Sequence, residues 1–192
     1  SDFSPIARLK SLRSLCVTPT YTRNISALAH LLELTHLHLD TGSQDISYVS
    51  ALKKLASLEI SVSYVSDMTP LSTLMGLRRL KISFIKSDIS ALRSLVAMID
   101  LEITRSSITD LSPLASMTSL TKLVLLETNV SDLSPISSLS SLTHIRVTLA
   151  PLRDLSTLAG SSVASLALFG IKSADYTPLS SLRALRELAI GN

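Results

Sequence analysis

Three side chains of the kinds that bind metal ions lie close together in the N-terminal part of the sequence. His36, His38 and Asp40 are spaced two residues apart, and on a β-strand this spacing turns all three to the same side. Imidazole and carboxylate groups are zinc ligands, and Cys16, one predicted strand away, would add a thiolate. A polar strand face without metal has the same composition and is the interpretation that we favour, so the sequence predicts no metal ion or other cofactor.

A second candidate for chemistry is an acidic residue that recurs through the chain at intervals of 21 or 22 residues. The series is Asp2, Asn24, Asp45, Asp67, Asp88, Asp110, Asp132, Asp154 and Asp175. Stacked carboxylates could bind calcium or act as acid and base. Because nearly every unit carries one, we predict a structural role in which each aspartate accepts backbone N–H groups of its own turn.

Motifs typical of enzymes are absent from the sequence. It holds no Gly-x-Ser-x-Gly turn for a nucleophilic serine, no glycine-rich phosphate loop, no Cys-x-x-Cys pair and no His-Glu-x-x-His zinc site. We therefore predict a protein without catalytic activity of its own.

The elements that position these side chains follow from a repeat that runs through the whole sequence. Apolar residues recur with spacings of three, three, three and two, as in Leu114, Met117, Leu120, Leu123 and Leu125. Successive units start at intervals of 21 or 22 residues, with their first apolar residue at Ile6, Leu28, Val49, Leu71, Leu92, Leu114, Ile136, Leu158 and Leu179. Such a period is typical of a solenoid in which each unit stacks on the next.

Each unit opens with residues that favour a helix. Two residues before the first apolar residue stands Ser or Thr, and in five units proline follows it. A hydroxyl can cap the free amide groups of a helix, and proline suits the first helical position. We predict a short helix that starts at the first apolar residue, and then a strand where the spacing changes to two.

The predicted fold is one α/β solenoid domain over residues 1–192, with nine parallel strands on its concave face and short helices on its convex face. The strands are centred on residues 15–17, 37–39, 58–60, 80–82, 101–103, 123–125, 145–147, 166–168 and 188–190. Neither end of the sequence shows a polar capping unit. We therefore expect a fragment of a longer array, whose edge strands around Leu15 and Leu188 favour end-to-end self-association.

The pattern Asp-Leu-Ser-Pro-Leu-x-x-Leu-x-x-Leu-x-x-Leu-x-Leu is clearest in residues 110–125 and 132–147. It resembles the 22-residue leucine-rich repeats of the bacterial internalins and of the regulatory subunits of type-1 protein phosphatase. The resemblance implies a leucine-rich-repeat horseshoe. Such repeats serve many unrelated partners, so it says little about function. The family usually has asparagine three residues after the Leu-x-Leu step. Here that position carries residues such as Ser106 and Thr128, so the roles of those asparagines do not carry over.

Residues that differ between units at the outward strand positions are the better candidates for binding. Charged residues occupy several of these positions: Glu59, Arg79, Lys81, Glu102 and Lys122. Bulky apolar residues and one arginine occupy others in the C-terminal half: Val124, Leu126, Leu149, Phe169 and Arg146. A contiguous group of exposed apolar side chains typically marks a contact surface. We predict that these ten residues bind a protein partner on the concave face.

Alternatives to this site and function stay open. The charges could neutralise one another on a solvated face, and the apolar residues could pack locally in turns. For function, the alternative to a protein-interaction scaffold is a repeat domain that positions substrate for, or regulates, a larger enzyme or phosphatase complex.

Composition bears on the remaining classes of partner and on the compartment. With 46% apolar residues the chain can build a core, but no apolar run reaches the length of about 18 residues that would suggest a membrane span. The net charge is +3 and the basic residues are scattered, so nucleic-acid binding is not predicted. A single cysteine fits a reducing compartment such as the cytoplasm, and a cell-surface location stays open.

Overall fold

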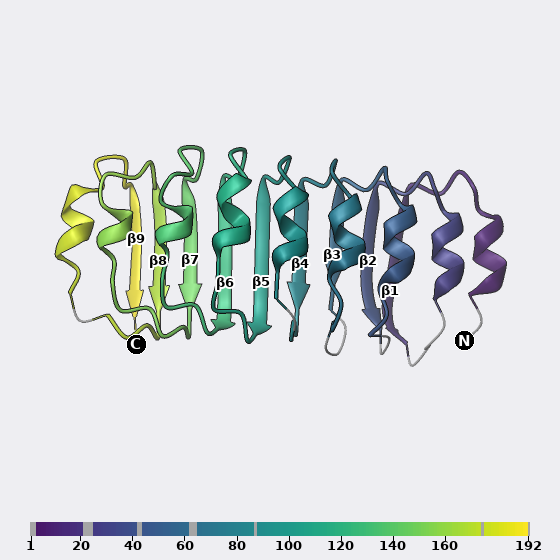
Figure 1. Ribbon diagram of the computed structural model, residues 1–192, viewed down its shortest axis with the longest axis horizontal. Coiled ribbons are helices and arrows are strands. Elements are labelled where there is room, and N and C mark those ends of the chain that lie inside the picture. The colour runs from purple at the N-terminus through teal and green to yellow at the C-terminus, as the bar shows by residue number, and fades with distance from the viewer. Residues whose placement is uncertain are drawn as a thin grey trace.

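The computed structural model describes residues 3–20, 25–41, 44–61, 65–86, 88–173 and 175–191. Two members of the recurring acidic series, Asp2 and Asn24, lie outside the described residues. The described part of the chain is a single stack of repeats, with the first and last units at opposite ends (Figure 1).

Nine parallel strands form one sheet within these residues, and each strand pairs with the next one in the sequence. They are β1 (Ser14–Thr20), β2 (His36–Thr41), β3 (Ser57–Ile60), β4 (Arg79–Ser83), β5 (Asp100–Ser106), β6 (Lys122–Thr128), β7 (His144–Thr148), β8 (Ser165–Phe169) and β9 (Glu187–Gly191). This confirms the prediction of a solenoid with nine parallel strands.

A short helix precedes each strand, and the helices form a second row beside the sheet (Figure 1). They are η1 (Ser4–Arg8), η2 (Ser26–His30), η3 (Ser47–Ala51), η4 (Thr69–Thr73), η5 (Ser90–Ser94), η6 (Ser112–Ser116), η7 (Ser134–Ile136), η8 (Ser156–Leu158) and η9 (Thr177–Ser181). Within the described residues, no helix is long and apolar enough to cross a membrane.

The nine helices of the described residues are all 3₁₀ helices, and the leucine spacing explains why. A 3₁₀ helix has 3.0 residues per turn, so apolar residues three apart lie on one side of it. The backbone of η6 follows the same period: the N–H of Leu114 donates to the carbonyl of Leu111, and the N–H of Met117 to that of Leu114, each at 2.9 Å. An α-helix, with 3.6 residues per turn, would rotate these side chains away from the sheet.

The helices begin two residues earlier than predicted, and their hydroxyl groups do not cap them. In η6 the first helical residue is Ser112, and no side chain makes a cap hydrogen bond from the N-cap position, Leu111. Instead Oδ1 of Asp110 accepts the backbone N–H of Ser112 at 2.7 Å. The predicted hydroxyl cap is wrong because the aspartate just upstream satisfies that N–H.

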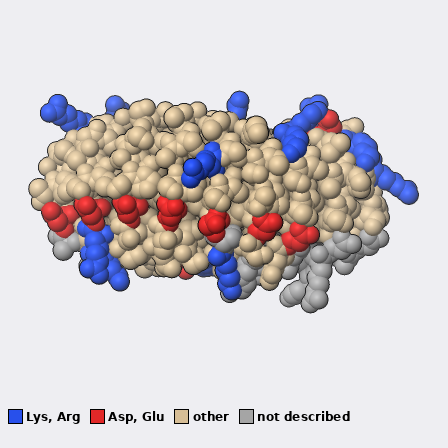
Figure 2. Space-filling view, viewed as in Figure 1, with Lys and Arg blue, Asp and Glu red and all other residues tan. Residues whose placement is uncertain are grey.

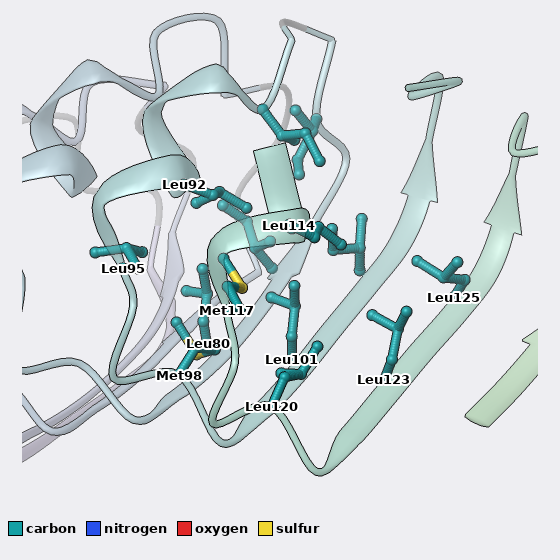
Figure 3. Packing of buried hydrophobic residues seen from close by; sticks show 14 of the residues in the cluster. Leu80, Leu92, Leu95, Met98, Leu101, Leu114, Met117, Leu120, Leu123 and Leu125 are labelled. Atoms are coloured by element: carbon teal, nitrogen blue, oxygen red, sulfur yellow. The ribbon is translucent and has the colours of Figure 1, made fainter. Parts of the chain in front are cut away.

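The core lies between the helices and the sheet and is almost entirely aliphatic (Figure 3). In the unit that starts at Leu114, the apolar residues Leu114, Met117, Leu120, Leu123 and Leu125 are all fully buried. Each buried side chain of this size stabilises the fold by about 1.5–3 kcal/mol relative to an exposed one. The edge strand β9 is less buried than the others: Leu188 and Ile190 are 50% and 42% exposed.

Candidate functional site

The side of the sheet turned away from the helices, called the open face below, carries the outward strand residues. Strand register places like positions of successive units next to one another, as predicted: Glu59 pairs with Lys81, Lys81 with Glu102, and Glu102 with Val124. The open face therefore consists of columns of side chains that run across all the strands. The predicted partner-binding residues of β3 to β8 lie in these columns, except Leu149, which follows β7.

Ionisable side chains on β2 to β5 form a connected network. Nδ1 of His38 lies 2.8 Å from Glu59 Oε2, and Lys81 Nζ lies 3.3 Å from Glu59 Oε1 and 3.6 Å from Glu102 Oε1. Burial raises the pKa of Glu59, but hydrogen bonds from His38 and Lys81 outweigh it and hold this pKa below its usual value. The hydrogen bond to Glu59 raises the pKa of Lys81, against its partial burial. The pKa shifts of Glu59 and Lys81 thus both favour the charged forms of this pair.

A separate ion pair links β5 and β6 in the neighbouring column of outward residues, the one that includes Arg79. Lys122 Nζ lies 3.2 Å from Asp100 Oδ2. Arg79 is adjacent to Asp100 by register, yet among the described residues it makes no ion pair. The alternative in which the charges neutralise one another therefore describes most of this N-terminal part of the open face.

Arg146 on β7 stands in different surroundings. Its neighbours in the column are Val124 on β6 and Ala167 on β8, neither of which carries charge. Its guanidinium carbon lies 5.8 Å from the centre of the Phe169 ring, a cation–π arrangement. Within the described residues Arg146 makes no ion pair. We call Leu126, Ala167 and Phe169 the apolar shelf; all three are partly exposed.

Val124 does not belong to the exposed part of this surface. Its side chain is only 7% exposed, so the expectation that it faces solvent is wrong. Register sets this short side chain between the long side chains of Glu102 and Arg146 on the adjoining strands, and long side chains of this kind cover their neighbours.

Two glycines fit closely against Phe169 at the end of β8 and Leu149 after β7. A Cβ atom added to Gly191 would lie 2.9 Å from Phe169 Cδ1, so the ring lies directly over β9. A Cβ on Gly170 would lie 2.6 Å from Leu149 Cδ2. Leu149 is nevertheless 59% exposed. Phe169 is therefore partly packed and partly available, while Leu149 projects from the turn after β7.

The turns that follow the strands hold a feature that the sequence did not reveal. Phe84, Arg105, Glu127 and Leu149 have φ values of 59°, 49°, 54° and 52°, in the left-handed region. Only Gly170, at the same position of the next unit, is a residue that adopts this region without strain. No glycine or asparagine signals the turn in the four earlier units. Arg105 lies over the Phe84 ring at 5.6 Å and within 3.4 Å of Glu127.

The recurring aspartates have the predicted structural role. Oδ1 of each described member accepts the backbone N–H of the Ser or Thr two residues later, at 2.7–2.8 Å. Hydroxyl and backbone hydrogen bonds from that residue lower the pKa of Asp67, Asp88, Asp132, Asp154 and Asp175, and for Asp110 the backbone bond contributes most. Figure 2 shows acidic side chains in a row across the helical side of the molecule.

The histidines considered as metal ligands have other partners. Nδ1 of His36 lies 2.9 Å from Thr35 Oγ1, and His38 faces Glu59. In the part of the chain that the structure describes, no three His, Cys, Asp or Glu side chains are grouped so that they could hold a metal ion. Cys16 is exposed and lies beside His38 in the register.

A hollow that was not predicted from the sequence lies where strands β7, β8 and β9 begin. Its volume is about 520 Å³, and its wall includes His144, Ser162, Ser165, Arg183 and Arg186. The two arginines precede β9 rather than lying on it, so an argument from alternating strand positions did not reach them. The hollow adjoins the open face at His144, two residues before Arg146.

Solved structures with the same architecture exist, whereas the sequence matches no protein-family model and no curated protein. Internalin C2 from Listeria monocytogenes is 24% identical, with a TM-score of 0.74 over 96% of this chain and 74% of that one. The internalin InlF from the same bacterium is 23% identical, with a TM-score of 0.64 over 100% of this chain and 78% of that one. A plant peptide hormone receptor, RGFR1 in complex with RGF2, is 18% identical, with a TM-score of 0.74 over 95% of this chain and 32% of the receptor.

At these identities the likeness concerns the fold. The narrower resemblance to internalin and phosphatase-subunit repeats stays a prediction. The parallel nine-stranded sheet of the described residues and the repeat of 21 or 22 residues are typical of a leucine-rich-repeat solenoid. The chain has the fold of leucine-rich-repeat proteins.

Proposed function

We propose that the chain is a non-catalytic interaction scaffold that binds a protein partner on the C-terminal half of the open face, over β6 to β9. The observation that carries the proposal is Arg146, which stands beside the apolar shelf without an acidic partner among the described residues. Arginine and aromatic side chains supply much of the binding energy at protein interfaces. Here the Arg146 guanidinium and the Phe169 ring are in contact with each other, and both are accessible from the open face.

The N-terminal half of the open face is less suited to bind tightly. Glu59, Lys81 and Glu102 already satisfy one another, so a partner would have to replace ion pairs that exist. Exposed ion pairs contribute only about 0–1 kcal/mol each, and exchanging one for another adds little. We therefore assign these charges to orientation and association rate, and the binding energy to the C-terminal half.

Two similar structures support a role in binding. The receptors RGFR1 and HAESA were solved as complexes with peptide hormones. Those ligands belong to those receptors. They support the proposal by showing that a stack of this kind can hold a polypeptide ligand.

The test is a capture experiment with matched arginine variants. Arg146→Ala removes the cation beside the apolar shelf, which has no ion-pair partner among the described residues, and Arg93→Ala removes an exposed arginine of η5 on the helical side. We expect at least one protein to be recovered by the wild-type chain and by Arg93→Ala, and to be depleted about tenfold with Arg146→Ala. If every recovered protein responds equally to the two variants, or only to Arg93→Ala, the proposal is wrong.

End-to-end self-association through β9 stays a prediction. Its support is the exposure of Leu188 and Ile190 on a strand with no further partner in the described sheet. Sedimentation velocity over a range of concentrations tests it. A concentration-dependent dimer that Leu188→Lys abolishes is the expected result, and a single monomeric species throughout would contradict it.

A further inference from the structure

We infer that the segment of the partner bound over β7 is an extended acidic peptide with the order apolar-x-acidic-x-acidic along one of its faces. The inference rests on the function proposed above and names the chemistry of its ligand. Three neighbouring features carry it: the apolar shelf, Arg146 and the hollow at the start of β7 to β9.

The hollow is predominantly cationic. Arg183 and Arg186 are both exposed, and neither makes an ion pair among the described residues. Glu187 is the one carboxylate in its wall, while Ser162 and Ser165 add hydroxyl groups. Together with Arg146, the surface therefore carries three arginines against one glutamate. An anion that enters here meets arginine side chains that make no ion pair within the described residues.

The backbone holds this arrangement in place. The N–H groups of Arg186 and Glu187 both donate to the carbonyl of Ala164, at 2.8 and 3.0 Å. The N–H of Arg183 donates to the carbonyl of Ser181 at 2.9 Å. The segment that carries the arginines is thus tied to β8 and to its own turn. Only the side chains must become ordered when a ligand binds, which limits the entropic cost of binding.

The spacing of the three features matches an extended chain. His144, Arg146 and Thr148 alternate onto the open face of β7, and Phe169 pairs with Thr148. Residues two apart in a strand are separated by about 6.6 Å, and their side chains lie on the same side. A peptide laid along β7 would therefore place an apolar side chain on the shelf, its next-but-one residue at Arg146, and the residue two further on at the hollow.

Carboxylates fit better than phosphate groups at these positions. Glu187 lies in the wall of the hollow, and it would repel a dianion more strongly than a single carboxylate. Arginine can bind a carboxylate with two parallel N–H donors. The apolar shelf requires a side chain beside the acids that prefers to leave water, which distinguishes this ligand from a purely acidic tract or a nucleic-acid strand.

The test uses short labelled peptides and the full chain. One peptide carries Leu-Ser-Glu-Ser-Glu between flexible Gly-Ser ends, and its control carries Leu-Ser-Gln-Ser-Gln. Fluorescence anisotropy at moderate salt should show binding of the acidic peptide to be at least about tenfold tighter than that of the control, the usual effect of contacts between charged groups. Equal binding of the two peptides would overturn the inference.

Matched arginine variants locate the binding. Arg146→Ala and the double variant Arg183→Ala/Arg186→Ala should each weaken the acidic peptide by about tenfold. Arg93→Ala removes an exposed arginine of η5 on the helical side and should change the affinity less than about twofold. All these side chains are exposed, and thermal melts check that each variant is folded. An Arg93→Ala effect equal to that of Arg146→Ala contradicts the proposed location.

Two further outcomes separate this inference from others. If a phosphoserine peptide of the same order binds more than tenfold tighter, or if single-stranded nucleic acid displaces the acidic peptide, the assignment of carboxylates is wrong. If Arg146→Ala depletes a captured protein but no acidic peptide binds, the proposed function stands and this inference fails.

Discussion

Replacing Phe169 with alanine distinguishes a binding residue from a core residue. The ring is partly exposed, packs over Gly191 and lies 5.8 Å from the guanidinium of Arg146. Full burial of a phenylalanine is worth about 1.5–3 kcal/mol, so this mostly buried ring contributes about 1–2 kcal/mol. The cation–π contact at an exposed site adds about 0.5–1 kcal/mol. We therefore expect the free energy of unfolding to fall by about 2 kcal/mol.

Urea unfolding measures this change, and Leu168→Ala is the matched control. Leu168 is the preceding residue of β8 and is fully buried against the core, so its truncation should cost about 2–5 kcal/mol. A Phe169→Ala cost equal to the Leu168→Ala cost would show that the ring is core and would refute its assignment to the open face. The same variant should weaken binding of the captured partner by about 1–3 kcal/mol, as truncation of an interface anchor does.

Three other changes have defined outcomes. The recurring aspartates have lowered pKa values, so their hydrogen bonds stabilise the fold at pH values above 3.8, the ordinary aspartate pKa, and this stability is lost as the pH falls below 3.8. Between pH 6 and pH 3 the melting temperature of Asp132→Asn should therefore fall less than that of the wild type. An equal fall would contradict the assignment. Gly170→Ala should lower the free energy of unfolding by about 1–2 kcal/mol because the φ of Gly170 is +58°. Adding Leu149→Ala should restore less than about 0.5 kcal/mol of it, because the exposed leucine can move aside. Full recovery in urea unfolding would mean that the steric contact with Leu149 dominates. Lys81→Met should lower the free energy of unfolding by less than about 1 kcal/mol, because the lysine side chain is 45% exposed. In unfolding at high salt, most of this difference from the wild type should disappear. A difference that persists at high salt would indicate packing instead of ion pairing.

The fold could be predicted in nearly all its parts because a solenoid repeats one local rule. The spacing from Leu114 to Leu125 alone sets which residues are buried, and its recurrence at 21 or 22 residues sets the parallel register of the sheet. The same spacing of three indicates a 3₁₀ helix rather than an α-helix, a consequence that the sequence analysis did not draw. The helix start was misplaced because Asp110, rather than the hydroxyl of Ser112, satisfies the first N–H group.

The candidate site was harder to predict because exposure depends on neighbouring units. Val124 occupies an outward position, but the lengths of Glu102 and Arg146 on the adjoining strands decide whether solvent reaches it. Arg183 and Arg186 lie outside the strands, so the alternation rule says nothing about them. The left-handed turn at Leu149 has no glycine or asparagine to reveal it.

The central claim is that the C-terminal half of the open face holds the partner. The most direct measurement is a nuclear magnetic resonance titration of the isotope-labelled chain with the protein recovered in the capture experiment. The account predicts that the largest shift changes fall on the amides of β6 to β9 and on the segment before β9 that carries Arg183 and Arg186. Changes confined to the helices η1 to η9, or to β1 to β4, would contradict it.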